Sequence, residues 1–237
     1  MASLLYSTEY KINDYIKIKI PTLGEVMRDE DNYNSIVSLL VATPLDMMVQ
    51  LDDIGVDFTT LNDWELFYRY LYKGLLDRDV SLVFGDLNLN DFELLKNKEN
   101  GEIVLANLYT GAVIDRSIHY QIAKFLRDIM GIEKSNKKPG NEEARKYMIE
   151  RARKKQKRAK QNAKHHSQFE SFIISLVNTS EFSYDYSSVL NLTLYQFYSS
   201  LRQISNKIRY DKLMIGVYAG TVNVKEINQS ELAWFAE

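Results

Sequence analysis

The feature that most constrains this chain is a basic segment in its second half. Between Arg145 and Lys164 there are ten lysines and arginines and one acid, Glu150. Burying an unpaired ammonium or guanidinium group costs several kcal/mol, roughly, even after relaxation, so these side chains cannot enter a core. Because no glycine or proline interrupts residues 141–166, we predict a helix over 142–165 that keeps most of its cations in water.

The formal charge of the chain is divided unevenly. Residues 133–165 hold 13 lysines and arginines against 4 glutamates, a net charge of +9, whereas the rest holds 17 against 28, a net charge of −11. Such a division predicts either an acidic partner for the basic part or attraction between the two parts.

Two interpretations of the basic helix remain open. It is either a phosphate-binding element, in which each cation displaces counterions, or a solvated helix that docks on acidic neighbours. For an acidic partner, the residues expected to make contact are Arg153, Lys154, Lys157 and Arg158.

The remaining pattern predicts an α+β fold, predominantly helical, with a small antiparallel β-meander and the long basic helix. Ile16, Ile18 and Ile20 alternate with polar residues, as in a half-buried strand. Asn100-Gly101 between two apolar runs predicts a hairpin, and a turn at Gly111 adds a third strand. Helices are expected over 34–43, 45–53, about 62–73, 115–130, 168–177 and 193–214, and a strand over 222–227 precedes a turn capped by Ser230.

A linker around Pro139-Gly140 divides the chain. We predict an N-terminal α+β domain over 1–134, the linker and basic helix over 135–165, and a C-terminal helical region over 166–237.

Aromatic residues are abundant, with 16 tyrosines and 10 phenylalanines. Trp64, Tyr68 and Tyr72 belong to a helix in which Tyr68, Tyr70 and Tyr72 alternate, so these side chains cannot all face a core. Exposed aromatic residues favour protein interfaces. We therefore expect Trp64, Tyr68 and Tyr72 to contact a partner, with a core rich in aromatic residues as the alternative.

No pattern in the chain predicts catalysis, a cofactor or a metal. There are no cysteines and no phosphate-binding glycine loop. His119 follows Asp115 by four residues, which is typical of a hydrogen bond on a helix surface. The aspartates at 52, 53, 57, 77, 79 and 86 lie in or beside predicted turns, where this residue bonds the local backbone. A metal-dependent hydrolase using these aspartates is the weakest of the functional hypotheses.

The compartment expected from the sequence is the cytoplasm. The longest apolar run is far too short to span a bilayer, and the first residues lack the apolar core of a signal peptide. No membrane contact is expected.

Five stretches occur together in an order and spacing that resemble a known protein family: 10–16 (YKINDYI), 20–25 (IPTLGE), 50–55 (QLDDIG), 84–87 (FGDL) and 232–235 (LAWF). The chain resembles a family encoded in the tail-gene clusters of tailed phages and prophages of Gram-positive bacteria. The resemblance covers nearly the whole chain and implies a tail-assembly chaperone or a minor tail component, present in the host cytoplasm or in the virion. It implies no catalytic residue.

The leading hypothesis is therefore a non-enzymatic phage morphogenesis protein that binds another phage structural or assembly protein. The alternative is a nucleic-acid-binding protein that uses the basic helix over 145–164.

Overall fold

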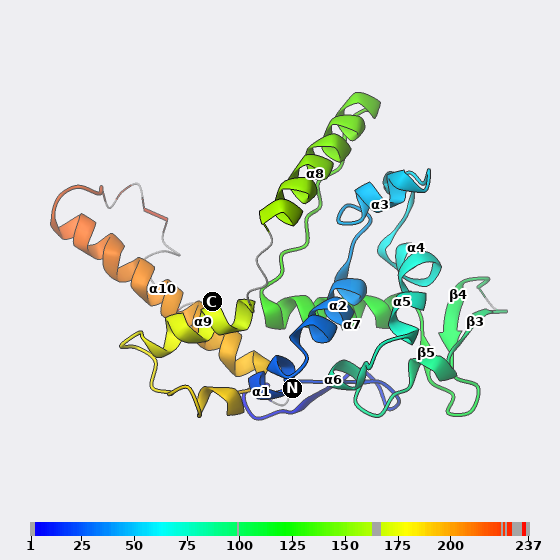
Figure 1. Ribbon diagram of the computed structural model, residues 1–237, viewed down its shortest axis with the longest axis horizontal. Helices are drawn as coiled ribbons and strands as arrows, with labels where there is room; N and C mark the ends of the chain where they lie inside the picture. Colours follow the sequence, from blue (N-terminus) through cyan, green and yellow to red (C-terminus); the bar gives the residue numbers. More distant parts are fainter. Residues whose placement is uncertain are drawn as a thin grey trace.

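Two helices, α2 (Glu30–Val41) and α7 (Arg116–Met130), pack against each other at the centre of the protein (Figure 1). The computed structural model describes residues 3–98, 100–162, 167–223, 225, 227–228 and 234–235. Fully buried aliphatic residues of α2, Ile36 and Leu40, meet Ile122 and Leu126 of α7 in one hydrophobic core. The fold is α+β and predominantly helical, as the sequence predicts.

The other elements surround this pair, and their bounds are as follows. The strands are β1 (Glu9–Lys11), β2 (Lys17–Lys19), β3 (Glu93–Lys96), β4 (Ile103–Ala106) and β5 (Val113–Ile114). The remaining α-helices are α1 (Leu23–Met27), α3 (Met48–Asp53), α4 (Asp63–Leu66), α5 (Lys73–Leu76), α6 (Ser81–Phe84), α8 (Glu142–Asn162), α9 (Gln168–Val177) and α10 (Leu194–Tyr218). Short 3-10 turns occupy η1 (Phe58–Thr60), η3 (Leu89–Asp91) and η4 (Val189–Asn191), and a π-helical turn occupies η2 (Phe67–Leu71).

The predicted β-meander is confirmed at one end of the molecule. Strands β3, β4 and β5 form an antiparallel sheet in that order, with Leu94 opposite Leu105. Only one residue of the predicted Asn-Gly pair adopts a positive φ, because Gly101 lies at +73° and no described residue other than glycine does so. The connection is consequently a longer loop, in which Asn97 donates its N–H to the carbonyl of Glu102 at 2.8 Å.

Strand β2 is confirmed inside the predicted alternating segment, and β1 pairs with it in an antiparallel hairpin. Ile16, Ile18 and Ile20 are all buried. Tyr10 of β1 stacks on Phe125 of α7 at 4.1 Å between ring centroids, which holds the hairpin against the central helices.

Capping residues mark where several of the helices begin and end. The side chains of Thr22, Asn62 and Thr193 each complete a capping box, and Asp115 caps α7. Gly131, with φ +66°, ends α7 in the left-handed conformation. One expectation needs correction, because α2 begins at Glu30 rather than Asn34.

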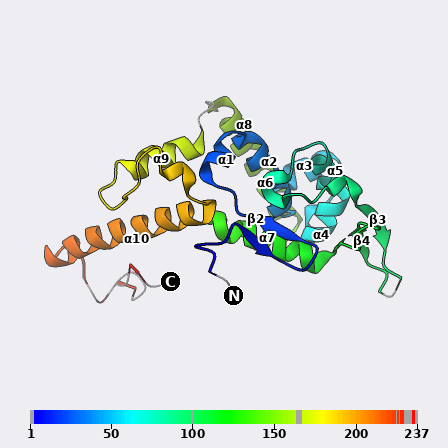
Figure 2. The same ribbon diagram turned by 90° about the horizontal axis from the view of Figure 1, so that it is seen from below.

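Helices α9 and α10 lie at the end of the molecule opposite the meander, and α8 stands apart from the central pair beside α3 (Figures 1 and 2). The core cluster takes in Phe169 of α9 and Phe197 of α10 as well as the N-terminal residues. How the chain divides into independently folding units stays a prediction. Most of the predicted strand over 222–227 and turn capped by Ser230 lies outside the described residues, and residues 222, 223, 225 and 227 form no strand. No helix of the described ranges is long and apolar enough to cross a membrane.

Candidate functional site

Helix α8 begins with a well-formed N-terminus. The side-chain oxygen of Asn141 accepts the N–H of Ala144 at 2.8 Å, and Glu142 and Glu143 occupy the first turn, where they complement the helix dipole. The helix is confirmed as far as Asn162. Residues 163–166, which would complete the predicted segment, lie outside the described residues.

One narrow face of α8 packs against α3. Ile149 anchors this face at 5% exposure, and Met148 and Ala152 are half-buried beside it. The spacing of Met148, Ala152, Ala159 and Ala163 predicts an apolar face along these four residues. This prediction misses Ile149, and Ala159 is exposed, so the packed face is shorter and confined to the first half of the helix. Ala163 lies outside the described residues.

Ion pairs fasten the same face to the acidic cluster of the N-terminal part. The guanidinium of Arg153 reaches Asp52 at 2.7 Å and Asp53 at 2.6 Å. The guanidinium of Arg145 reaches Asp57 at 3.6 Å and the nearby Glu142 at 2.6 Å. Hydrogen bonds to Asp52 and Asp53 raise the pKa of Arg153 further. Attraction between the basic and acidic parts of the chain, one of the two outcomes predicted from the charge division, is therefore present.

The rest of α8 carries cations that are exposed and have no acidic partner in the described ranges: Arg151, Lys154, Lys155, Lys157, Arg158 and Lys160. Four of them, at spacings of three and four residues, share one stripe: Arg151, Lys154, Lys155 and Arg158. At 100° per residue, roughly, this stripe lies on the side of the helix opposite Ile149. We call these four residues the outward stripe.

The structure thus separates the four cations predicted to contact a partner. Arg153 is engaged by Asp52 and Asp53 within the chain, whereas Lys154 and Arg158 belong to the outward stripe and Lys157 lies at the edge of the face toward α3. Arg151 and Lys155 complete the stripe and were not singled out from the sequence. Their spacing relative to Ile149 is the signal that could have identified them.

The predicted aromatic surface needs a larger correction. Trp64 is 6% exposed and Tyr72 is 5% exposed, so neither is available at the surface. The indole N–H of Trp64 donates to the carbonyl of Ile103 at 3.1 Å, and the hydroxyl of Tyr72 donates to the carbonyl of Leu89 at 2.6 Å. Tyr68 is half-buried against Trp64, at 5.5 Å between ring centroids.

Trp64, Tyr68 and Tyr72 are four residues apart, so helical spacing places them on one face, and in the structure this face is turned toward the core. A π-helical turn lies within it, in which the N–H of Tyr72 donates to the carbonyl of Phe67, five residues earlier, at 2.8 Å. Tyr70, by contrast, is 38% exposed.

His119 is not a surface residue, contrary to the expectation from its spacing to Asp115. It is 2% exposed and stacks on Phe67 at 4.3 Å between ring centroids. Asp115 instead accepts the N–H of Ile118 as the helix cap. Burial lowers the pKa of His119 to about 4, and its Nε2 atom has no hydrogen-bond partner in the described part of the chain.

The aspartate clusters serve the local structure. Besides the pairs with α8, Asp57 accepts the N–H of Thr59 at 2.9 Å and Asp79 accepts the N–H of Ser81 at 3.0 Å. No group of three or more histidine, aspartate or glutamate side chains within the described ranges is arranged to hold a metal ion.

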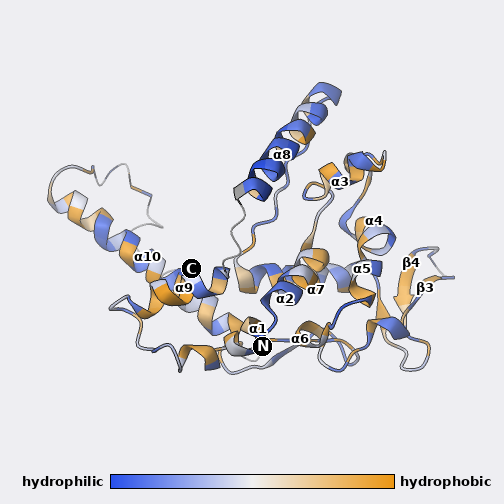
Figure 3. Cartoon of the chain, viewed as in Figure 1, coloured by the Kyte–Doolittle hydropathy of each residue, from blue (hydrophilic) through white to orange (hydrophobic). Residues whose placement is uncertain are grey.

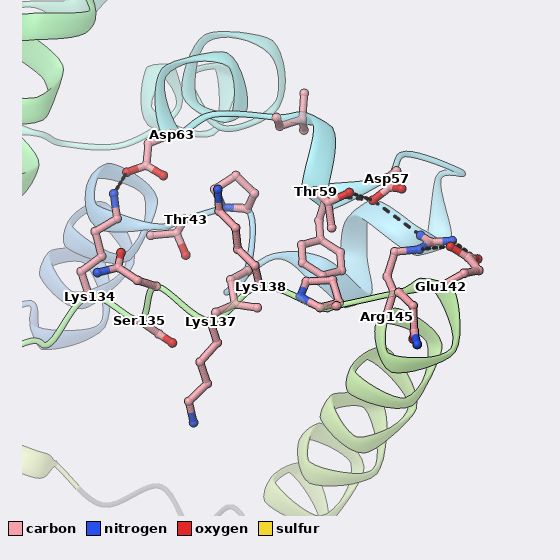
Figure 4. A pocket seen from close by; sticks show the side chains of 18 residues that line it. Thr43, Asp57, Thr59, Asp63, Lys134, Ser135, Lys137, Lys138, Glu142 and Arg145 are labelled. Carbon is pink, nitrogen blue, oxygen red and sulfur yellow. Dashed lines mark hydrogen bonds and ion pairs between the residues drawn. The ribbon is translucent and has the colours of Figure 1, made fainter.

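A groove of about 470 Å³ lies where the segment after α7 passes η1 on its way to α8 (Figure 4). Lys134 pairs with Asp63 at 2.5 Å and fixes one end, and Arg145 with Asp57 fixes the other. Lys137 extends away from the groove into the open (Figure 4). The groove holds acids and bases in similar number, so it is not a site for a single class of charged ligand.

Comparison with known proteins relates part of the chain to one family. Residues 155–237 match the family described as YomV second domain, whose name is associated with phages and prophages. The match covers the end of α8, from Lys155 on, together with α9 and α10, about a third of the chain. None of the curated proteins and none of the solved structures matches this chain.

Proposed function

We propose that this chain is a non-enzymatic phage morphogenesis protein, a tail-assembly chaperone or minor tail component, that binds another phage protein through the outward stripe of α8. The phage-associated name of the family matched over residues 155–237 supports the setting. The resemblance of the five sequence stretches to a tail-cluster family points in the same direction.

The observation that carries the proposal is the two-sided charge of α8. On one side Arg145 and Arg153 are paired with Asp57, Asp52 and Asp53 of the same chain. On the other side the outward stripe has no acid to pair with in the described residues. Four like charges on one face destabilise a helix by a few tenths of a kcal/mol per pair, roughly, and an acidic partner would remove this cost.

The dimensions of the stripe favour a protein as the partner. Arg151 and Arg158 are seven residues apart, which is about 10 Å along the helix axis. Tyr147, 65% exposed and one turn before Arg151, adds an aromatic contact to the same side. An aromatic residue beside a few cations is a common composition for a protein interface.

Nucleic acid is the second candidate, because the six unpaired cations of α8 would displace counterions from phosphates. The net charge of −11 on the chain outside residues 133–165 opposes it, since a long polyanion would also run past the acidic body.

The test replaces Arg151, Lys154, Lys155 and Arg158 together by Gln. Each protein encoded by the same phage would be co-expressed with the tagged chain, and capture by the wild type and the variant compared. We expect one protein to be captured by the wild type and lost with the variant, while the thermal unfolding curve stays unchanged.

The matched control replaces four exposed cations elsewhere, Lys73, Lys96, Arg116 and Lys124, by Gln, which changes the net charge equally. This control should capture the partner as the wild type does. Equal loss of partner capture in both variants would show that net charge, and not the outward stripe, accounts for binding. Undiminished capture of the partner by the outward-stripe variant would show that the outward stripe is not the contact. Retention of double-stranded DNA at 150 mM salt by the wild type and not by the outward-stripe variant would favour the second candidate.

A further inference from the structure

Helix α10 carries a heptad pattern along its whole length. Its residues at alternating spacings of three and four are mostly apolar: Leu194, Phe197, Leu201, Ile204, Ile208, Asp211, Ile215 and Tyr218. This is the spacing of the positions that meet a second helix in a coiled coil. We call this line of residues the α10 seam.

The first half of the seam is used within the protein. Leu194 and Phe197 are fully buried, and Leu201 and Ile204 are half-buried against the core. Here α10 packs on α7. Beside Leu201 the seam opens into an apolar groove of about 650 Å³, whose walls include Val41, Ile132 and Phe172.

The second half of the seam leaves the body. Figures 1 and 3 show the distal part of α10 running away from the remaining helices with apolar residues along it. Ile215 is 68% exposed and Tyr218 is 84% exposed. Thr221 and Val222 turn back onto Gly216, whose carbonyl accepts the N–H of Thr221 at 3.0 Å and the N–H of Val222 at 3.2 Å.

The charges beside the seam decide what can cover it. Lys207 and Lys212 occupy the two positions that flank a heptad seam. Asp211 and Glu181 hold Lys207, whereas Lys212 pairs with no acid of the described residues. In a pair of identical α10 helices Lys212 would face Lys207 in the parallel orientation and a second Lys212 in the antiparallel one. Because like charges at such positions disfavour pairing, a second copy is a poor occupant.

We propose that the distal α10 seam, from Ile208 to Tyr218, binds an acidic helix of a partner protein by coiled-coil packing. The partner would place apolar residues against Ile208 and Ile215 and glutamates beside Lys212 and Arg202. Arg202 lines the groove and pairs with no acid of the described residues. Asp211 is already neutralised by Lys207 at 2.8 Å, so it does not repel an acidic helix as a free carboxylate would. This surface is separate from α8, so the inference does not depend on the function proposed for that helix.

The experiment uses the full chain and a fluorescent synthetic peptide of three heptads, with leucine at the seam positions and glutamate at the flanking positions. A matched peptide carries lysine in place of each glutamate. Binding is followed by fluorescence anisotropy, and the mass of the protein alone is measured by sedimentation.

We expect the acidic peptide to bind and the basic peptide to bind at least tenfold more weakly. Ile215→Glu, at an exposed position that folding does not require, should weaken the acidic peptide at least tenfold. Lys212→Glu should weaken the acidic peptide and strengthen the basic one. Asn206→Glu, an exposed position off the seam of the same helix, adds the same charge as Ile215→Glu and should have a much smaller effect.

Three results would overturn the inference. The first is no binding of the acidic peptide, and the second is equal weakening by Asn206→Glu and Ile215→Glu. The third is a dimer of the protein alone that Ile215→Glu dissociates, because a second copy would then be the occupant.

Discussion

The guanidinium of Arg153 lies 2.7 Å from the carboxylate of Asp52, a residue 101 positions earlier in the chain. Together with the pair to Asp53 it ties the middle of α8 to the end of α3. Both partners are well exposed to solvent, so salt screens the contact.

Arg153→Gln is therefore expected to loosen α8 without unfolding the protein. Amide hydrogens of residues 150–160 should exchange faster with solvent, and the midpoint of thermal unfolding should change little. Lys154→Gln, one residue further and on the outward stripe, is the control and should leave exchange as it is in the wild type. Slower or unchanged exchange in Arg153→Gln would show that Ile149 alone holds the helix.

His119 should make stability depend on pH. Its pKa is lowered from 6.5 to about 4 in the folded protein, so the unfolded chain binds a proton more readily. The stabilisation is fully present above pH 6.5 and is lost progressively as the pH falls toward 4. Between pH 7.5 and 5 this amounts to about 2 kcal/mol.

His119→Phe should remove this part of the pH dependence. The measurement is the free energy of unfolding in urea at the two pH values for both proteins. The carboxylates are the same in the two proteins, so their contribution cancels when the variant is compared with the wild type. A wild type and variant that lose the same stability on acidification would show that His119 can be protonated without unfolding.

Tyr72→Phe should cost about 1–2 kcal/mol, because it removes the hydroxyl that satisfies the buried carbonyl of Leu89. Tyr70→Phe removes the same atom from an exposed ring two residues away and should cost almost nothing. Urea unfolding of the two variants provides the comparison. An equal loss of unfolding free energy in the two variants would contradict the burial of Tyr72 and make it a candidate for partner contact again.

Gly101→Ala should destabilise the β3–β4 hairpin by about 1 kcal/mol, since alanine is strained at a φ of +73°. Gly140→Ala is the matched control, because Gly140 has no positive φ and open space around it. Its unfolding free energy should equal or slightly exceed that of the wild type. A neutral Gly101→Ala would mean that the loop relaxes to another turn.

The elements that could be predicted from the sequence are those fixed by local chemistry. Thr22, Asp115 and Thr193 cap helices because their side chains accept the backbone N–H three residues on, and Gly131 ends α7 because it accepts a left-handed conformation. The charge of α8 also predicted correctly that its cations stay in solvent.

The residues that were misplaced depend on distant partners. Trp64 is buried because Ile103 and His119 lie over it, and neither neighbour can be read from the helix that carries it. Tyr72 is buried because its hydroxyl bonds the carbonyl of Leu89, 17 positions later in the chain. Ile149 was overlooked because basic residues surround it, and its role appears only when α3 is placed beside α8.

The starts of α1 and α10 are joined to each other. Leu23 donates its N–H to the carbonyl of Leu192 at 2.8 Å, Leu194 donates to the carbonyl of Pro21 at 2.9 Å, and Thr22 and Thr193 form an antiparallel bridge. During synthesis on a ribosome, residues 21–23 emerge long before residues 192–194. The hydrogen bonds between them therefore cannot form until the later residues have emerged. Helix α1 cannot reach its final environment until most of the chain has been translated, and a nascent chain stalled before residue 192 should expose Leu23 to chaperones.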